Sequence, residues 1–377
     1  LQGRVMGHKK LSQPGWPAMS LDCRPMIGLA CLFLVGCASI GPPSVPKDRF
    51  DYNTAVSDSW KEQTLLNILK LRYADMPLFM EVASIVAGYS LESAVNIAGT
   101  AVEGSANPGV LSLGGSGKYT DRPTITYAPI TGSDFNKNFL TPIPPSALLF
   151  LIQAGWPADV FLPITLEAIN GLRAQKSAGA GERQGNRDFY RVIELFGEIQ
   201  RAGALGMRVV TEANSDETTV LVIRHDNLSA KAMAASLELT TLLGVDPDVD
   251  EYQVAFAEVA KNNRELALLT RSTLTIMLEL AGQVRVPAAH IEEGRTLPSQ
   301  FDYDDENRSP GARLIDIRHS AERPADAFVA VRYRDLWFWI DDRDFRSKRT
   351  LAYLMLLFSL TESGGKEGLP LVTIPAG

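Results

Sequence analysis

Residues 83–97 read Ala-Ser-Ile-Val-Ala-Gly-Tyr-Ser-Leu-Glu-Ser-Ala-Val-Asn-Ile, and every odd position except Ser93 holds an apolar side chain. Side chains of a β-strand point alternately to its two faces, so this pattern predicts one long strand with an apolar face. The commonest strand length is about five or six residues, which this segment exceeds. We therefore expect Ile85, Tyr89 and Val95 to belong to an interaction surface.

The segment that follows is rich in glycine. Residues 104–117 contain five glycines, and residues 123–127 read Pro-Thr-Ile-Thr-Tyr, which is typical of another strand. Two to four strands joined by glycine-rich turns are therefore expected between residues 79 and 128. A phosphate-binding loop ending at Lys118 would need glycine at 112 and Ser or Thr at 119. Ser112 and Tyr119 stand there instead, so we expect a turn between strands around 114–117.

A helix is predicted before the long strand. Ser59-Trp60-Lys61-Glu62 has the form of a capping box, in which Ser59 caps the helix and Glu62 reaches back. Apolar residues then recur at helical spacing as far as Pro77. A second, short helix is predicted over 146–153, followed by an edge strand over 160–168.

The polar, glycine-containing stretch 175–186 is the strongest candidate for a linker between domains. We therefore expect a β-rich domain with its helix over 59–174, a linker over 175–186 and a second domain over 187–377. The second domain is predicted to hold helices over 187–202, 229–243, 272–284 and 346–360. Hairpins are expected over 208–224, 252–270 and 327–340, with a further strand over 313–320. Hairpins that alternate with helices predict an α+β fold with antiparallel or mixed sheets.

Near the N-terminus, Arg24 precedes a run of ten apolar residues, 26–35, and Gly36 and Cys37 follow. A bilayer-spanning helix needs about 20 apolar residues, so this run is too short to be one. A basic flank, a short apolar stretch and a small residue are typical of a secretory signal. Leu34-Val35-Gly36-Cys37 resembles the lipobox of bacterial lipoproteins, whose signal is cut before a cysteine that then carries lipid such as palmitate.

This resemblance implies a signal peptide over 1–36, lipidation of Cys37 and a flexible tether over 37–58. The start site is expected to be Met19, with residues 1–18 untranslated. Residue 38 is Ala rather than the Asp that favours inner-membrane retention, so we expect a lipid anchor on the periplasmic face of the outer membrane. The stretch from Arg332 to Arg349 also resembles uncharacterised proteobacterial outer-membrane lipoproteins, to which no activity is attached.

The composition excludes several classes of function. The chain has 377 residues and a net charge of −7, which argues against binding to nucleic acid. Its three cysteines are Cys23, Cys31 and Cys37, so removal of the signal leaves only the lipidated one. Disulfides and thiolate catalysis are therefore not expected in the mature protein.

Motifs for catalysis, cofactors and metals are missing from the sequence. The four histidines show no zinc-binding spacing, and His225, His290 and His319 are expected to be surface or capping residues. The acidic stretch 302–307 lacks the glycine and the glutamate of a calcium-binding loop. We predict no catalytic, cofactor-binding or metal-binding residue and favour a protein that is not an enzyme.

A second part of the predicted interaction surface lies near the C-terminus. Trp337 and Trp339 share one face of a predicted strand, which is either buried on both faces or an exposed aromatic patch. Basic residues at the start of the last helix either pair with the aspartates of 341–344 or face an anionic partner. These basic residues are Arg346, Lys348 and Arg349.

Together these features predict a lipid-anchored envelope protein with a structural, assembly or interaction role. Its partners would be the membrane, through the N-terminal lipid, and either another copy of itself or another envelope protein. A subunit of an oligomeric outer-membrane barrel, channel or secretion complex is the first alternative, because barrel strands alternate over about ten residues. A periplasmic hydrolase that uses carboxylates is the second alternative.

Lipidation can be tested directly. Mass spectrometry of the mature N-terminus should find a diacylglyceryl group on Cys37, and Cys37→Ala should abolish both signal cleavage and membrane association. Unchanged processing and membrane association in Cys37→Ala would contradict the predicted anchor.

Overall fold

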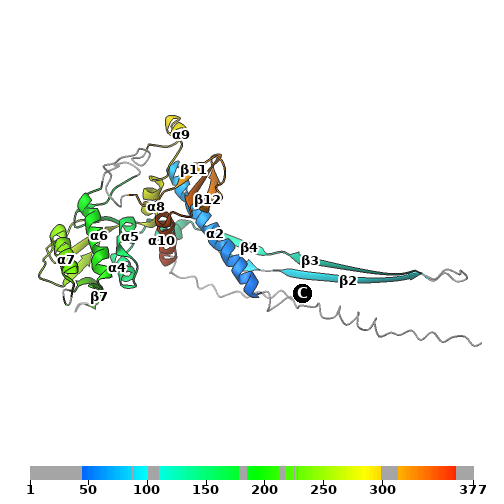
Figure 1. The fold of residues 1–377 in the computed structure, drawn as a ribbon, viewed down its shortest axis with the longest axis horizontal. Coiled ribbons are helices and arrows are strands. Elements are labelled where there is room, and N and C mark those ends of the chain that lie inside the picture. The colour runs from blue at the N-terminus through cyan, green and yellow to red at the C-terminus, as the bar shows by residue number, and fades with distance from the viewer. Residues whose placement is uncertain are drawn as a thin grey trace, which may run out of the picture. The chain divides into compact units, whose positions relative to one another are not determined.

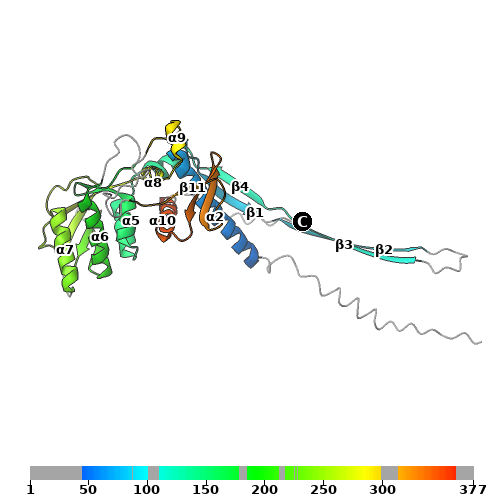
Figure 2. The ribbon, with the colours of Figure 1, turned by 45° about the horizontal axis from the view of Figure 1, so that its top comes forward.

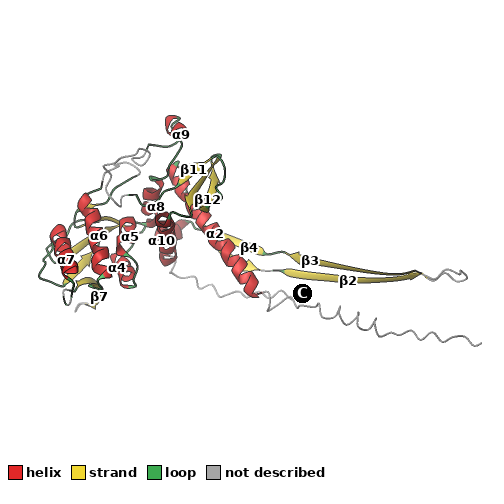
Figure 3. Ribbon diagram, viewed as in Figure 1, coloured by secondary structure: helices red, strands yellow, loops and turns green. Residues whose placement is uncertain are grey.

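The computed structural model describes residues 45–86, 88–100, 110–177, 185–211, 217–224, 226, 228–298 and 313–361 (Figure 1). Helices alternate with antiparallel and mixed sheets (Figure 3), which confirms the predicted α+β class. The described chain forms two compact units. One contains residues 45–51 and 89–120, and the other contains residues 52–88 and the described residues from 121 onward.

Helix α2 (Val45–Arg72) begins well before the predicted start. Ser59 lies inside this helix, so the predicted N-cap at Ser59 is wrong, and residues 45–58 are helical rather than a tether. Pro46 is compatible with a first helical turn, and Asp48 suits the positive end of the helix dipole. The helix ends where Ala74 takes a positive φ of 57°.

The predicted long strand is two strands, β1 (Met80–Val86) and β2 (Tyr89–Thr100). β2 pairs with β3 (Val110–Asp121) in a two-stranded sheet, where the Ser112 hydroxyl donates to the carbonyl of Ala98 at 3.1 Å. Gly114, Gly115 and Gly117 lie within β3, so the turn predicted there is wrong.

β1 pairs antiparallel with β4 (Thr124–Pro129), with Ile85 opposite Ile125. The register shifts between Val82 and Ser84. Helix α3 (Gly132–Phe135) and the π-helix η1 (Asn136–Leu140) follow β4 along the chain.

The largest sheet has six strands in the order β6-β5-β10-β9-β8-β7. Their bounds are β5 (Leu166–Ile169), β6 (Leu172–Arg173), β7 (Leu205–Thr211), β8 (Glu217–Ile223), β9 (Glu251–Ala255) and β10 (Glu265–Thr270). The hairpin predicted for β9 and β10 is wrong, because these two strands are parallel. β5 pairs with β10, so strand pairing joins segments on both sides of the predicted linker at 175–186, and the predicted division at that linker does not coincide with the two units.

Helices α7 (Ala230–Leu243), α6 (Arg187–Arg201), α5 (Ala158–Thr165) and α10 (Phe345–Thr361) pack as successive neighbours (Figure 2). The edge strand predicted over 160–168 is wrong for its first part, since α5 occupies it with Pro163 inside the helix. The short helix α4 (Pro145–Gln153) is confirmed, and Gly155 after it has a φ of 92°. Helices α8 (Thr273–Ala281) and α9 (Ala288–Glu292) complete the described helices.

A three-stranded sheet in the order β11-β13-β12 precedes α10. It consists of β11 (Arg318–Ser320), β12 (Ala327–Tyr333) and β13 (Leu336–Asp341). Arg334 and Asp335 both have a positive φ, 49° and 67°, which confirms the predicted tight hairpin. Asp344 accepts from the Ser347 amide at 3.1 Å, so an aspartate caps the last helix.

Candidate functional site

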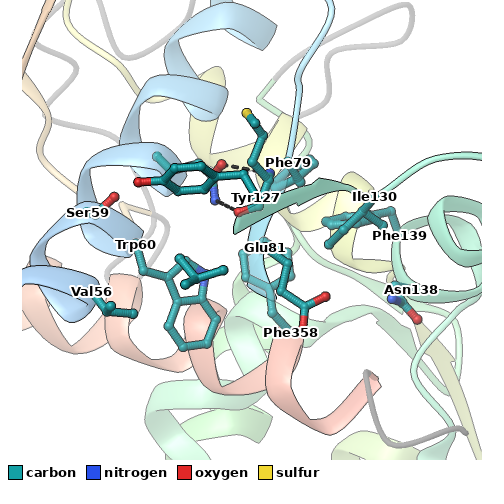
Figure 4. A pocket seen from close by; sticks show the side chains of 13 residues that line it. Val56, Ser59, Trp60, Phe79, Glu81, Tyr127, Ile130, Asn138, Phe139 and Phe358 are labelled. Carbon is teal, nitrogen blue, oxygen red and sulfur yellow. Dashed lines mark hydrogen bonds between the residues drawn. The ribbon is translucent and has the colours of Figure 1, made fainter. Parts of the chain in front are cut away.

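A largely apolar cavity of the larger unit has a volume of about 390 Å³ and lies among α2, β1, β4, η1 and α10 (Figure 4). In this view Trp60 and Ile130 lie on opposite sides of it. The lining residues are Val56, Ser59, Trp60, Gln63, Phe79, Met80, Glu81, Val82, Tyr127, Ile130, Asn138, Phe139 and Phe358.

Three buried phenylalanines form the floor of this cavity. The rings of Phe79 and Phe139 stack with centroids 4.1 Å apart, and Phe358 of α10 lies 5.6 Å from Phe79 and 5.4 Å from Phe139. All three are at most 4% exposed. Aromatic pairs at these separations stabilise one another beyond the burial of their area, so the three rings support one another in the floor of the cavity.

Helix α2 supplies the opposite wall from positions 56, 59, 60 and 63, which lie on one face of a helix. The Gln63 side-chain amide holds the backbone of Met80 by accepting from its N–H at 2.8 Å and donating to its carbonyl at 3.0 Å (Figure 4). Asn67 holds Leu78 in the same way, at 2.9 Å and 2.8 Å. These bonds fix the distance between the helix and strand β1.

The polar groups at the cavity are few. Glu81 is the only charged residue among the thirteen that line it. Ser59, Trp60, Tyr127 and Asn138 make no side-chain hydrogen bond to other residues that the structure describes. The cavity therefore offers an apolar interior with unused donors and acceptors.

A second group of polar and aromatic side chains surrounds the end of α2. Its members bind one another and hold the end of the helix in place. The Tyr73 hydroxyl lies 2.7 Å from Nδ1 of His290, and Tyr333 and Arg334 bind Asp75. Burial raises the pKa of Tyr73 to about 12 and lowers the pKa of His290, so a neutral phenol and a neutral imidazole share this hydrogen bond.

The prediction that His290 is a surface or capping residue is wrong, because it is 9% exposed and bonded to Tyr73. His319 is half-buried in β11, next to the Phe338 ring, and burial lowers its pKa. His225 lies outside the described residues.

The residues of the predicted interaction surface fall on separate elements. Ile85 is half-buried in β1, whereas Tyr89 and Val95 belong to β2 in the other unit, and Val95 is 71% exposed. Cys37 and the acidic stretch 302–307 lie outside the described residues.

Trp337 and Trp339 are half-buried, with the guanidinium groups of Arg323 and Arg318 over their rings at 5.3 and 5.5 Å. The strand is therefore neither buried on both faces nor an open aromatic patch. These stacked cations cover part of each ring, as cation–π pairs do.

The three basic residues of α10 have different surroundings. Lys348 pairs with Asp342 at 2.6 Å, as one of the two predicted arrangements requires. Arg349 lies over the Phe345 ring at 5.3 Å. Arg346 is exposed and, with Arg349, lines a smaller pocket of about 320 Å³ beside α10.

The sequence did not point to the residues of the apolar cavity. Positions 56, 59, 60 and 63 carry a helical pattern, but Ser59 and Trp60 were assigned to a helix start. Phe79, Phe139 and Phe358 are far apart in the sequence, and no local pattern indicates that they meet.

The burial of His290 predicts how stability depends on pH. The unfolded chain takes up a proton near the ordinary histidine pKa of about 6.5, whereas folded His290 resists protonation. The free energy of unfolding should therefore fall as pH drops from 7 to 5. His290→Gln, which stays neutral, should weaken this pH dependence by at most about 1.4 kcal/mol per pH unit. The free energy of unfolding at each pH is measured by chemical denaturation. The pH dependence that remains in this variant should come from His319, whose pKa is also lowered by burial. An unchanged pH dependence in His290→Gln would contradict this assignment.

In the part of the chain that the structure describes, helices long and apolar enough to cross a membrane are not found. Nor do these residues bring together three His, Cys, Asp or Glu side chains that could hold a metal ion. No protein-family model, curated protein or solved structure matches this chain.

Proposed function

We propose that the chain is a lipid-anchored outer-membrane lipoprotein facing the periplasm, in which the β2–β3 hairpin has an assembly role. The observation that carries this proposal is the form of the hairpin. β2 and β3 have twelve residues each and make a two-stranded sheet, with no third strand among the described residues.

A two-stranded sheet is marginally stable in water by itself, so a neighbour is needed to cover it. Its outer edges carry backbone N–H and C=O groups that are ready to pair with another strand. Ser90, Glu92, Ala94, Val95 and Asn96 are exposed along β2. Addition of a strand to such an edge is a common mode of protein association.

The location rests on the sequence. Cys37 stands eight residues before the first described residue of α2, and its lipid would hold the following chain at the membrane surface. One acyl chain gives only marginal membrane binding, so a stable anchor needs a second membrane-binding group. Additional acyl chains on the same cysteine would supply it.

A barrel subunit is the second candidate, and the length of the strands favours it. A membrane-spanning β-strand needs about 9–11 residues. β2 and β3 each exceed this requirement, and apolar residues alternate with polar ones in β2. The arrows of β2 and β3 point in opposite directions in Figure 1, so the outer edge of β2 in one copy could pair antiparallel with β3 of the next, and repeated pairing would close a barrel.

The apolar cavity gives no such support to the carboxylate-dependent hydrolase, although two carboxylates, those of Asp159 and Glu194, line the smaller pocket beside α10. Glycoside hydrolases of the usual kinds place two carboxylates about 5–10 Å apart. The residues that line the described apolar cavity include a single carboxylate, that of Glu81.

Val95 provides the test of the assembly role because its side chain is exposed. Val95→Arg should leave folding intact and abolish self-association or partner binding, since a charge would disrupt an apolar contact. Val209→Arg is the matched control, a 51% exposed valine in β7. Light scattering after size-exclusion chromatography in detergent should show smaller particles for Val95→Arg alone. Equal particle mass for wild type and Val95→Arg would contradict the proposal.

The same position separates the two candidates. A thiol introduced by Val95→Cys is the only unmodified one in the mature chain, because Cys37 is lipidated. The protein is placed in liposomes by dilution of the detergent and treated with a water-soluble maleimide. A strand of a membrane-spanning barrel would have this thiol covered by lipid, so the maleimide would not react with it. A hairpin that pairs with its partner outside the membrane would leave the thiol reactive.

A further inference from the structure

The smaller pocket beside α10 is lined by side chains of both charges. Its volume of about 320 Å³ is within the range of about 300–1,000 Å³ that small-molecule sites occupy. It lies among α5, α6 and α10, which pack as neighbours (Figure 2). α10 contributes Arg346 and Arg349, whereas α5 and α6 contribute Asp159 and Glu194. The Asp159 carboxylate is already paired with Arg201 at 2.9 Å, so Glu194 is the acidic group that matters most for a ligand.

Arg349 has no carboxylate paired with it among the residues that the structure describes. Its guanidinium lies over the Phe345 ring at 5.3 Å, and its buried Nε has no hydrogen-bond partner there. Arg349 also stands near the start of α10, where the helix dipole adds to the positive potential. A carboxylate matches both the charge and the planar fork of a guanidinium, so it is the group that this side of the pocket favours.

Glu194 keeps part of its negative charge. It pairs with Arg191 at 3.2 Å, but the same guanidinium pairs with Glu238 at 2.7 Å and lies 3.7 Å from Glu198. Lys231 adds one more cation, 3.4 Å from Glu198. In the described part of the chain, three carboxylates of this group thus share two cations. An ammonium group in the pocket would be attracted to Glu194.

The remaining lining is mostly apolar, and part of it is fixed by hydrogen bonds. The Leu314 N–H donates to the Gln283 side chain at 2.6 Å, and the Leu314 carbonyl accepts from the Thr350 hydroxyl at 2.8 Å. An apolar side chain that packed on this lining would be removed from water, which favours binding. The apolar lining residues are Val160, Pro163, Ile193, Leu314 and Phe345.

We propose that this pocket binds a small zwitterion, an α-amino acid with an apolar side chain. The ligand carboxylate binds Arg349, its ammonium group faces Glu194, and its side chain packs on the apolar lining. The pocket volume is near the lower end of the range for ligand sites, which suits a molecule of this size. The proposal is independent of the assembly role of the hairpin, because every residue it uses belongs to the larger unit.

Three ligands that share a phenylethyl body test the recognition of both charges. Phenylalanine carries the carboxylate and the ammonium group, 3-phenylpropionate carries the carboxylate alone, and 2-phenylethylamine carries the ammonium group alone. The mature chain with Cys37→Ser is used, since it lacks lipid and needs no detergent. Isothermal titration calorimetry at neutral pH should show one saturable site per chain for phenylalanine. Each analogue should bind at least about tenfold more weakly, because it lacks one charge-assisted contact.

Variants assign each charge of the ligand to its residue. Arg349→Gln should weaken phenylalanine binding at least about tenfold without weakening the binding of 2-phenylethylamine, which has no carboxylate. Glu194→Gln should remove the advantage of phenylalanine over 3-phenylpropionate. Arg343→Gln is the matched control, because Arg343 precedes α10 and pairs with Asp326 but does not line the pocket. This control should bind all three ligands as the wild type does.

The opposite results would overturn the proposal. Equal affinity of the wild type for phenylalanine and 3-phenylpropionate would show that the ammonium group is not recognised. Unchanged phenylalanine binding in a folded Arg349→Gln protein would show that the carboxylate does not bind Arg349. Lack of saturable phenylalanine binding to the wild type would remove the site.

Discussion

Two side-chain amides of helix α2 hold the backbone of the strand that follows it, and the arrangement of the cavity depends on this contact. Gln63 bonds both backbone groups of Met80, and Asn67 bonds both of Leu78. Four residues of helix rise about 6 Å, and two residues of strand rise about 6.6 Å. The spacing of the two amides thus matches the strand, so four hydrogen bonds form along one line. Asn67 is 1% exposed, and loss of its side chain would remove both hydrogen bonds to the backbone of Leu78.

This contact explains why a cavity exists beside it. With the start of β1 held against α2, the helix face that continues through Trp60 and Val56 forms one wall of the cavity. Phe139 of η1 and Phe358 of α10 close the opposite side by packing on Phe79. The cavity is therefore the space left between a helix and a strand that are joined by polar bonds at one point and separated by aromatic rings elsewhere.

Local signals in the sequence predicted the features that depend on local chemistry. The α+β class, the short helix α4 and the hairpin at Arg334 and Asp335 followed from periodicity and turn residues, and the structure confirms them. The wrong predictions arose where a local pattern fits two kinds of secondary structure, or where no local pattern exists. The capping-box residues at Ser59 sit in the middle of α2, and the short apolar run that holds Pro163 suits a strand as well as a helix. The parallel pairing of β9 with β10, and a cavity drawn from five elements, depend on contacts between distant segments that no local pattern encodes. The strand β2 could be predicted, because the alternation of apolar and polar residues along it is itself a local pattern.

The central claim is that the two amides of α2 fix β1 and thereby form the cavity. Hydrogen exchange at the backbone amide of Met80 tests it most directly, since that amide donates to the side-chain oxygen of Gln63 at 2.8 Å. In Gln63→Leu the Met80 amide should exchange at least about tenfold faster, as expected when a protecting hydrogen bond is lost, while the amides of the six-stranded sheet keep their wild-type protection. Unchanged exchange at Met80 in a folded Gln63→Leu protein would contradict the account.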